Sequence, residues 1–195
     1  AVALWHDGEI LRAAMPEAVT ITDKARDVVA MLVTGPTSRA ILAEISDADL
    51  TLGWLTHQQA NVAGKPAMLA RVSFAGELGW EVHCTPEDAV TVYAAIRDAG
   101  AAPFGMYALN SMRIEKGYLT WKGDLSADYG LFETGLGRFV KLDKPQDFPG
   151  KAALAEAQQP PAKRLVPVAA WRRSRRQICL RSNRTADRQL RQPLD

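Results

Sequence analysis

Short runs of apolar residues, each of strand length and each bounded by small or polar residues, recur along the chain. Runs of this length predict strands at residues 28–33, 68–74, 80–84 and 137–143. Residues 46–66 favour a loop that contains one further short strand. The runs at 68–74 and 80–84 are separated by a turn of small residues, and this arrangement predicts a β-hairpin.

Other segments carry the signals of helices. Apolar residues at helical spacing predict helices over residues 37–45, 86–99 and 107–116, and a short helix is expected at 151–157. The second of these has the strongest start, because Thr85 can cap it and proline and two acids follow. A glycine follows both the second and the third helix, as is typical of helix ends.

The pattern changes after residue 157. Residues 158–162, Gln-Gln-Pro-Pro-Ala, are typical of a linker, and residues 163–169 predict one more strand. We therefore expect a domain over residues 1–157 and the start of a further domain at 163–170. Residues 171–195 show no sustained period and are expected to be an arginine-rich tail, disordered or non-native. A shifted reading frame also fits this abrupt change, and sequencing the encoding DNA would test that hypothesis.

The net charge of +2 conceals two oppositely charged parts. Residues 164–195 hold nine arginines against two aspartates, a charge of +7, which leaves residues 1–163 at −5. Such a tail can bind nucleic acid, but the acidic body and the single interleaved aromatic, Trp171, disfavour that function. Its test is an affinity for DNA or RNA that falls with salt and disappears when residues 171–195 are deleted.

The composition excludes several other classes. The 195 residues are 47% hydrophobic and 24% charged, as in ordinary globular proteins. No apolar run of about 18 residues predicts a membrane helix, and the N-terminus lacks a signal-peptide pattern and an initiator methionine, so a part of a longer protein is expected. The two cysteines, Cys84 and Cys179, form no framework and favour a cytoplasmic protein. No metal site is predicted, because the histidines are isolated: His6, His57 and His83.

The predicted hairpin carries a candidate binding group. Its turn, Ala75-Gly76, is followed by Glu77, and Trp80 lies three residues further along. An acid beside an aromatic suits a flat heterocycle rich in donors, because one carboxylate can accept from two adjacent N–H groups. On the residues alone, a solvated surface charge remains the better interpretation of Glu77.

Several motifs together resemble the aminomethyltransferase family, in order and spacing, over about residues 19–168. This family includes the glycine cleavage T-protein and the folate-binding parts of the dimethylglycine and sarcosine dehydrogenases, and the form seen here is closer to the dehydrogenase-linked members. The motifs are Gly-Pro-Thr-Ser-Arg at 35–39, Ala-Gly-Glu-Leu-Gly-Trp-Glu at 75–81, Arg-Ile-Glu-Lys-Gly-Tyr at 113–118 followed by Trp121, Asp124 and Leu125, Glu-Thr-Gly-Leu-Gly at 133–137, Val-Lys-Leu-Asp-Lys at 140–144 and Phe-Pro-Gly-Lys at 148–151.

The resemblance implies an α+β fold, with mixed or antiparallel sheets packed by helices and a C-terminal β-barrel that is incomplete here. It implies tetrahydrofolate as the ligand and one-carbon transfer as the reaction. The one-carbon donor would be the aminomethyl group of a lipoyl carrier protein, or an N-methyl amine such as dimethylglycine or sarcosine. In the latter case a flavin dehydrogenase domain would belong to the parent protein.

The resemblance also implies site residues. Glu77 matches the glutamate that binds the pterin ring, and Arg113 matches an arginine that contacts the folate tail carboxylates. Trp80 and Tyr118 are candidates for stacking on the folate rings, with core packing as the alternative for both. The alternative for Arg113 is an ion pair with a nearby acid. We expect Asp124 to be a structural tie.

The chain also departs from the family. The acid credited with catalysis in the family lies upstream of these residues, so the catalytic residue is unknown and this chain is expected to lack the catalytic acid. Phe74 stands where the family often has tyrosine. A non-catalytic folate-binding or interaction module is the remaining alternative, although the relatives that serve iron–sulfur assembly carry a Lys-Gly-Cys-Tyr motif that this chain lacks.

Overall fold

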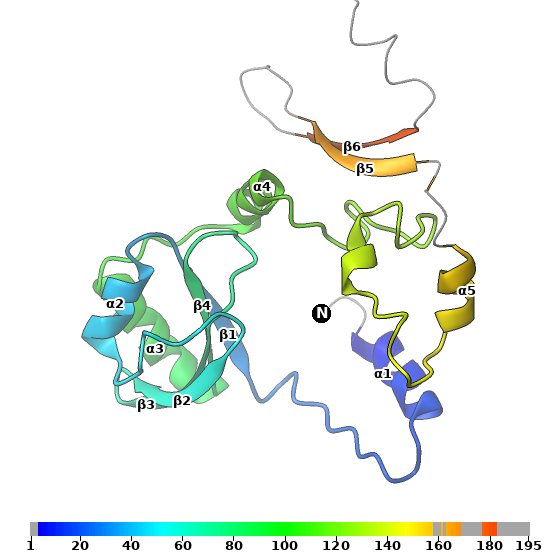
Figure 1. Cartoon of the computed structure of the whole chain (residues 1–195). Helices are drawn as coiled ribbons and strands as arrows, with labels where there is room; N and C mark the ends of the chain where they lie inside the picture. Colours follow the sequence, from blue (N-terminus) through cyan, green and yellow to red (C-terminus); the bar gives the residue numbers. More distant parts are fainter. Residues whose placement is uncertain (1–3, 158–160, 162, 169–176, 183–195) are drawn as a thin grey trace, which may run out of the picture. The chain divides into compact units, whose positions relative to one another are not determined.

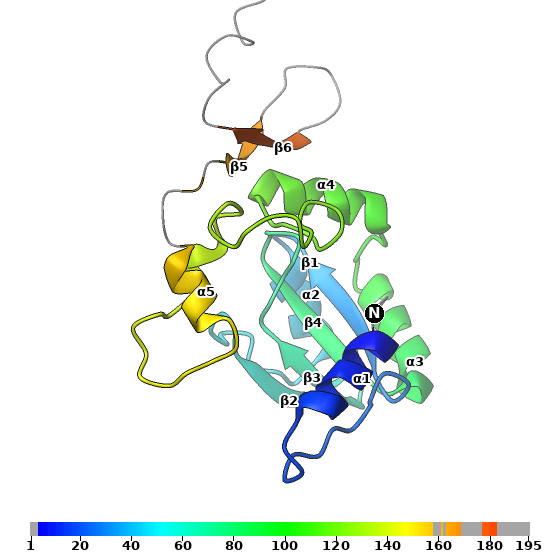
Figure 2. The ribbon, with the colours of Figure 1, turned by 90° about the vertical axis from the view of Figure 1, so that its right-hand side faces the viewer.

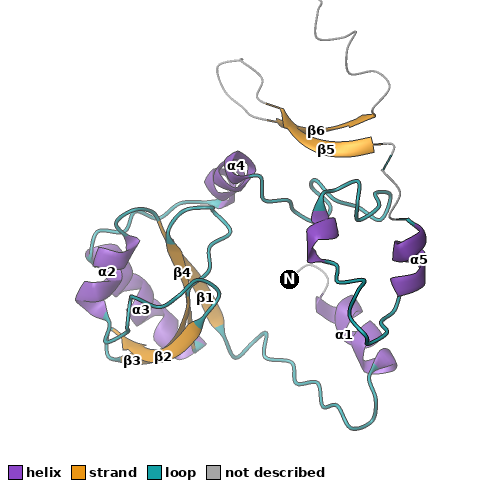
Figure 3. Cartoon of the chain, in the orientation of Figure 1, coloured by secondary structure: helices purple, strands orange, loops and turns teal. Residues whose placement is uncertain are grey.

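The computed structural model describes residues 4–157, 161, 163–168 and 177–182 of the chain (Figure 1). The chain divides into two compact units. The first comprises Ala1–Ser73 and Leu78–Ala102, and the second comprises Phe74–Glu77 and Pro103–Asp195. Helices and antiparallel strands occur together (Figure 3), so the predicted α+β class is confirmed.

A four-stranded antiparallel sheet forms the centre of the first unit. Its strands run in the order β1-β4-β3-β2, and β1 pairs with β4 from Val29↔Cys84 to Thr34↔Gly79. Every second residue of β4 faces the core, which buries Trp80 and Val82 completely. The strands are β1 Val29–Thr34, β2 His57–Val62, β3 Lys65–Ala70 and β4 Gly79–Cys84.

Two helices, α2 (Ser38–Ile45) and α3 (Pro86–Asp98), lie against one face of this sheet (Figures 1 and 2). Leu42 of α2 and Val92 of α3 are fully buried in the same hydrophobic core as the inward residues of the strands. Removing this apolar surface from water is the main force that holds the layers together. The helix α1 (Leu4–Ala14), which the sequence did not predict, buries no residue.

The predicted helix ends are confirmed. The hydroxyl of Thr85 accepts a hydrogen bond from the backbone N–H of Asp88 at the start of α3, at 3.4 Å. Gly117 ends α4 (Met106–Lys116) in the left-handed conformation, with φ of +81°. The second unit also contains the short helix α5 (Lys151–Glu156) and a hairpin of β5 (Lys163–Val168) and β6 (Gln177–Ser182).

Three local predictions were wrong. The strand predicted at 68–74 ends at Ala70, and residues 71–78 form a loop. Residues 137–143 form no strand; instead a 3₁₀ turn, η1 (Leu136–Phe139), follows a left-handed Gly135, and the exposed Phe139 provides no buried face. The strand β6 lies where no element was predicted, and residues 171–176 and 183–195 of the expected tail lie outside the described residues.

Two further observations concern membrane-spanning helices and metal sites. No helix in the described part of the chain is long and apolar enough to cross a membrane. Within the same residues, no group of three or more histidine, cysteine or acidic side chains is placed to hold a metal ion.

Candidate functional site

The loop of residues 74–77 is anchored to the end of α4. The ring of Phe74 stacks on that of Tyr118, with centroids 5.9 Å apart and planes inclined by 18°. Gly76 has a φ of +79°, and a Cβ at this position would lie only 2.5 Å from the Cβ of Lys116. Because glycine alone has no Cβ, it lets the loop backbone lie directly against the last turn of α4.

Glu77 follows as an exposed residue. No hydrogen bond or ion pair joins its carboxylate to another residue in the described part of the chain. The backbone before it is held in place, since Ala75 is 2% exposed and Gly76 lies against α4. An exposed carboxylate without an internal partner, on an anchored loop, is available to a ligand.

The end of α4 fixes the backbone of Tyr118. The N–H of Tyr118 donates to the carbonyl of Arg113 at 2.8 Å, and the N–H of Gly117 donates to the carbonyl of Ile114 at 3.0 Å. Together with the left-handed Gly117, these bonds form the usual glycine-terminated helix end. The half-buried ring of Tyr118 therefore leaves the helix at a defined position.

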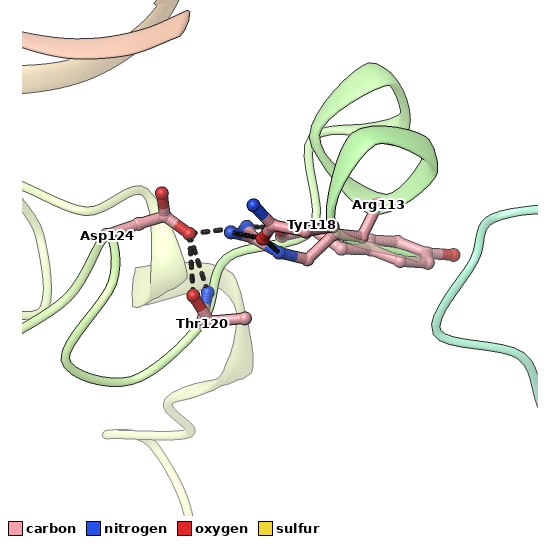
Figure 4. A network of polar contacts seen from close by, with 5 residues as sticks. Arg113, Tyr118, Thr120 and Asp124 are labelled. Carbon is pink, nitrogen blue, oxygen red and sulfur yellow. Dashed lines mark hydrogen bonds and ion pairs between the residues drawn. The ribbon is translucent and has the colours of Figure 1, made fainter. Parts of the chain in front are cut away.

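Arg113 is the one buried residue of α4, at 4% exposure. Its Nη1 donates to the carbonyl of Tyr118 at 2.8 Å and to the Oδ2 of Asp124 at 2.5 Å (Figure 4). Its Nε donates to the Oδ1 of Asn110 at 2.7 Å, and its Nη2 bonds the same oxygen. Groups of the protein thus bind the guanidinium. The sequence analysis gave an ion pair with a nearby acid as the alternative role of Arg113, and Asp124 forms that ion pair.

Asp124 is the acid that neutralises Arg113. The same Oδ2 atom also accepts from the backbone N–H of Thr120 at 2.8 Å and from its hydroxyl at 3.0 Å (Figure 4). The side chains of Asp124 and Arg113 are only 12% and 5% exposed. The expectation that Asp124 is a structural tie is confirmed by these bonds. Asp124 also lines a hollow of about 380 Å³ together with Lys122, Ser126 and other residues of its loop.

Trp80 lies in the other unit and has no exposed surface. The guanidinium carbons of Arg71 and Arg39 lie 4.8 Å and 5.7 Å from the centre of its ring. Its indole Nε1 is buried and has no hydrogen-bond partner within the described residues. Trp80 is thus part of the hydrophobic core, which is the alternative that the sequence analysis gave for it.

The structure therefore brings three of the four predicted site residues into one unit. Arg113 and Tyr118 bond directly, Tyr118 stacks on the loop that ends in Glu77, and Trp80 belongs to the core of the first unit. The sequence analysis missed Asn110 as a partner of Arg113. Its position three residues earlier on the same helix was the available signal.

The buried thiol offers no alternative reactive group. Burial raises the pKa of the Cys84 thiol above its ordinary value, and the charge of Asp88 raises it further. A thiol with a raised pKa is a poor nucleophile because little thiolate is present at neutral pH.

With the fold and these contacts established, the comparisons with known proteins define the class of protein. Residues 1–144 match the family model of the GCVT N-terminal domain. The chain belongs to the GCVT N-terminal domain family, as the motifs of the sequence indicate.

Relatives of two kinds are similar to the chain. It is 38% identical over 139 residues to the mitochondrial dimethylglycine dehydrogenase of Mus musculus, and the alignment covers 68% of the chain and 16% of that protein. It is 40% identical over 147 residues to the aminomethyltransferase of Saccharopolyspora erythraea, and the alignment covers 73% of the chain and 40% of that protein. The chain thus spans less than half the length of these relatives.

A solved structure, the heterotetrameric sarcosine oxidase from Corynebacterium sp. U-96 in complex with pyrrole 2-carboxylate, shows a partial likeness. The TM-score is 0.39 at 20% identity, and the match covers 50% of the chain and 52% of that structure's chain.

Proposed function

We propose that this chain is the tetrahydrofolate-binding part of a larger enzyme that transfers a one-carbon unit. Membership of the GCVT N-terminal domain family supports this function. The observation that carries the proposal is the exposed carboxylate of Glu77, which has no partner in the described part of the chain and lies on a loop anchored to α4.

The pterin ring of tetrahydrofolate presents a ring N–H and an exocyclic amino group side by side. A single carboxylate accepts from both, and Glu77 has the right chemistry and exposure to do so. Each such charge-assisted hydrogen bond contributes about 1.5–3 kcal/mol when it is shielded from water. Tyr118, stacked on Phe74 in the same loop region, would offer its half-buried ring to the folate rings.

Arg113 and Trp80 fit the ligand less directly. The guanidinium of Arg113 already donates to Asn110, Tyr118 and Asp124. These contacts favour a role in holding the residues around the site in place, and not direct binding of the folate. The complete burial of Trp80 favours support of β4, the strand that follows Glu77.

The reaction needs a donor for the one-carbon unit. In the aminomethyltransferase version, an aminomethyl group on a lipoyl carrier protein gives its carbon to tetrahydrofolate and releases ammonia. In the second version, the carbon comes from an oxidised N-methyl group of dimethylglycine or sarcosine, and a flavin dehydrogenase domain belongs to the parent protein. The relatives of both kinds keep both versions as candidates.

The chain's own residues would bind and orient the folate, because holding two reactants in register supplies much of the rate. A positioned acid or base is also needed for proton transfer, and we assign that role to no residue of this chain. A cytoplasmic location remains a prediction, and the dehydrogenase relatives are named as mitochondrial proteins.

Titration with folinic acid, a stable reduced folate, tests the proposal. Tryptophan fluorescence can report binding, because Trp121 is 64% exposed and lies in the loop after Tyr118. We expect saturable binding that Glu77→Gln weakens about tenfold or more, as the loss of one charge-assisted hydrogen bond requires. The matched control is Glu115→Gln, which removes another exposed carboxylate, from α4, and should leave affinity within about twofold.

The outcomes separate the candidate functions. Equal losses in both variants would mean that general charge, and not a specific carboxylate, governs the affinity. Absence of binding by the wild-type chain would remove the folate function from this part of the protein. Binding without any transfer of a labelled one-carbon unit in the full-length parent would favour a non-catalytic folate-binding module.

A further inference from the structure

The buried ion pair beside the candidate site has no ligand-facing role in the function described above. We propose that Asp124 is a positioning residue for Glu77 and acts through Arg113, Tyr118 and the loop of residues 74–77. This inference rests on the proposed folate function, since Glu77 is taken as the group that binds the pterin.

The first link is the pair itself. Asp124 holds Arg113 at a 2.5 Å contact, and both side chains are almost completely buried. Because water does not reach the guanidinium, Asp124 is its counter-charge, and removing that charge leaves a cation in a poorly solvated place. Thr120 donates to the same carboxylate oxygen twice, which fixes the direction from which Arg113 is held.

The second link runs from Arg113 to Tyr118. The guanidinium binds the carbonyl of Tyr118, and the backbone carbonyl of Arg113 binds the N–H of the same residue, both at 2.8 Å. Both polar groups of the Tyr118 backbone are therefore held by one residue. A shift of the guanidinium would release one of the two bonds and let the ring of Tyr118 move.

The third link connects Tyr118 to Glu77. The ring of Tyr118 stacks on Phe74, and Gly76 lies against Lys116, so the loop takes its position from the end of α4. Nothing in the described part of the chain holds the side chain of Glu77 itself. The position of Glu77 is consequently set by this loop. The series of contacts that fixes the loop begins at Asp124 and runs through Arg113 and Tyr118.

The test is a double-mutant cycle on the affinity for folinic acid. Asp124→Asn keeps the size of the side chain and removes the charge. With Glu77 present, we expect Asp124→Asn to weaken binding by about fivefold or more. With Glu77→Gln already in place, it should weaken binding less than about twofold, because coupled residues do not act additively. Asp47→Asn, at an exposed carboxylate of the first unit, is the control that should change neither affinity.

Equal losses in the two backgrounds would overturn the proposal, since Asp124 would then affect binding independently of Glu77. A merely structural role predicts the same equal losses, together with a fall in stability. Hydrogen exchange gives a second readout that needs no folate: Asp124→Asn should speed exchange of the amides at residues 75–77 by about tenfold, and unchanged exchange there would also overturn the proposal.

The exchange measurement separates this proposal from the folate function. If the wild-type chain binds no folinic acid, the proposed function fails, and the exchange rates still decide whether Asp124 positions the loop. If Asp124→Asn does not fold, Phe74→Leu replaces it in the cycle, because Phe74 is 40% exposed and lies outside the ion pair. It should show the same coupling to Glu77, and independent losses would contradict the role of the stack.

Discussion

Replacing Gly76 by alanine should release the loop of residues 74–77 from α4 without unfolding the second unit. The alanine Cβ would lie 2.5 Å from the Cβ of Lys116, an atom that is fixed to the helix backbone and cannot swing away as the end of a side chain can. The φ of +79° adds a second cost, because residues with a Cβ rarely adopt this conformation.

Two competing costs decide the result. Keeping the loop in place would cost about 1–2 kcal/mol for the left-handed backbone and about 1–3 kcal/mol for the overlap. Releasing it loses the stacking of Phe74 on Tyr118, which contributes about 0.5–1.5 kcal/mol. Release is cheaper, so the free energy of unfolding should fall by only about 0.5–1.5 kcal/mol while the position of Glu77 is lost.

Denaturant unfolding and hydrogen exchange together measure both effects. We expect faster exchange at residues 75–77, a small loss of stability and loss of folinic acid binding. The control is Gly150→Ala, because Gly150 has a φ of +87° and a Cβ there would meet nothing within 4 Å. It carries the backbone cost alone and should leave exchange at residues 75–77 unchanged.

The reasoning is refuted if Gly76→Ala leaves exchange and binding as they are in the wild type. It is equally refuted if the variant loses the full cost of about 2–5 kcal/mol with the loop still protected.

Three further predictions concern the first unit. Trp80→Ala should lower the free energy of unfolding by about 3 kcal/mol in urea titrations, towards the lower end for a buried tryptophan because its Nε1 has no described partner; a loss below about 1 kcal/mol would contradict its burial. Ala63→Asn should raise the free energy of unfolding by about 0.5–1 kcal/mol in the same assay. Ala63 and Gly64 both have positive φ in the two-residue turn between β2 and β3, and such a turn favours Asn-Gly, so a loss of stability would argue against this turn type. The pKa of the Asp47 carboxyl lies below its ordinary value, because the side-chain amide and the backbone N–H of Asn61 donate to it. Its stabilising contribution is therefore present above the unfolded-state pKa and is lost as pH falls through the lower folded pKa. Carboxyl NMR titration should show that the pKa of Asp47 rises in Asn61→Ala, where the side-chain donor is missing.

Local signals in the sequence predicted most of the helices. The cap at Thr85, the proline after it and the glycine at 117 each act within one or two turns, so their effect does not depend on the rest of the fold. Short apolar runs likewise predicted strands at 28–33 and 80–84, and the structure has them at 29–34 and 79–84. The family motifs then predicted the fold class, because they fix elements in order along the chain.

The hairpin and the segment 137–143 show where this approach fails. Phe74 looks like the end of a strand, but its ring stacks on a tyrosine 44 positions away in the sequence, and the chain leaves the strand after Ala70. The segment 137–143 alternates only loosely: its apolar members, Phe139 and Leu142, lie three residues apart, and Phe139 is 68% exposed. No described strand pairs with this segment, and the left-handed Gly135 precedes a 3₁₀ turn instead. A period of two residues predicts a strand only where a partner exists to pair with it.

The sequence by itself determined the ends of α3 and α4, the α+β class and the choice of Glu77 as the candidate ligand group. Tertiary structure decided what each of the other predicted site residues contacts. It placed Arg113 against Asp124 and the backbone of Tyr118, and it buried Trp80 beside Arg71. These contacts join residues from separate elements, and their burial and pairing depend on packing that no local pattern of residues encodes.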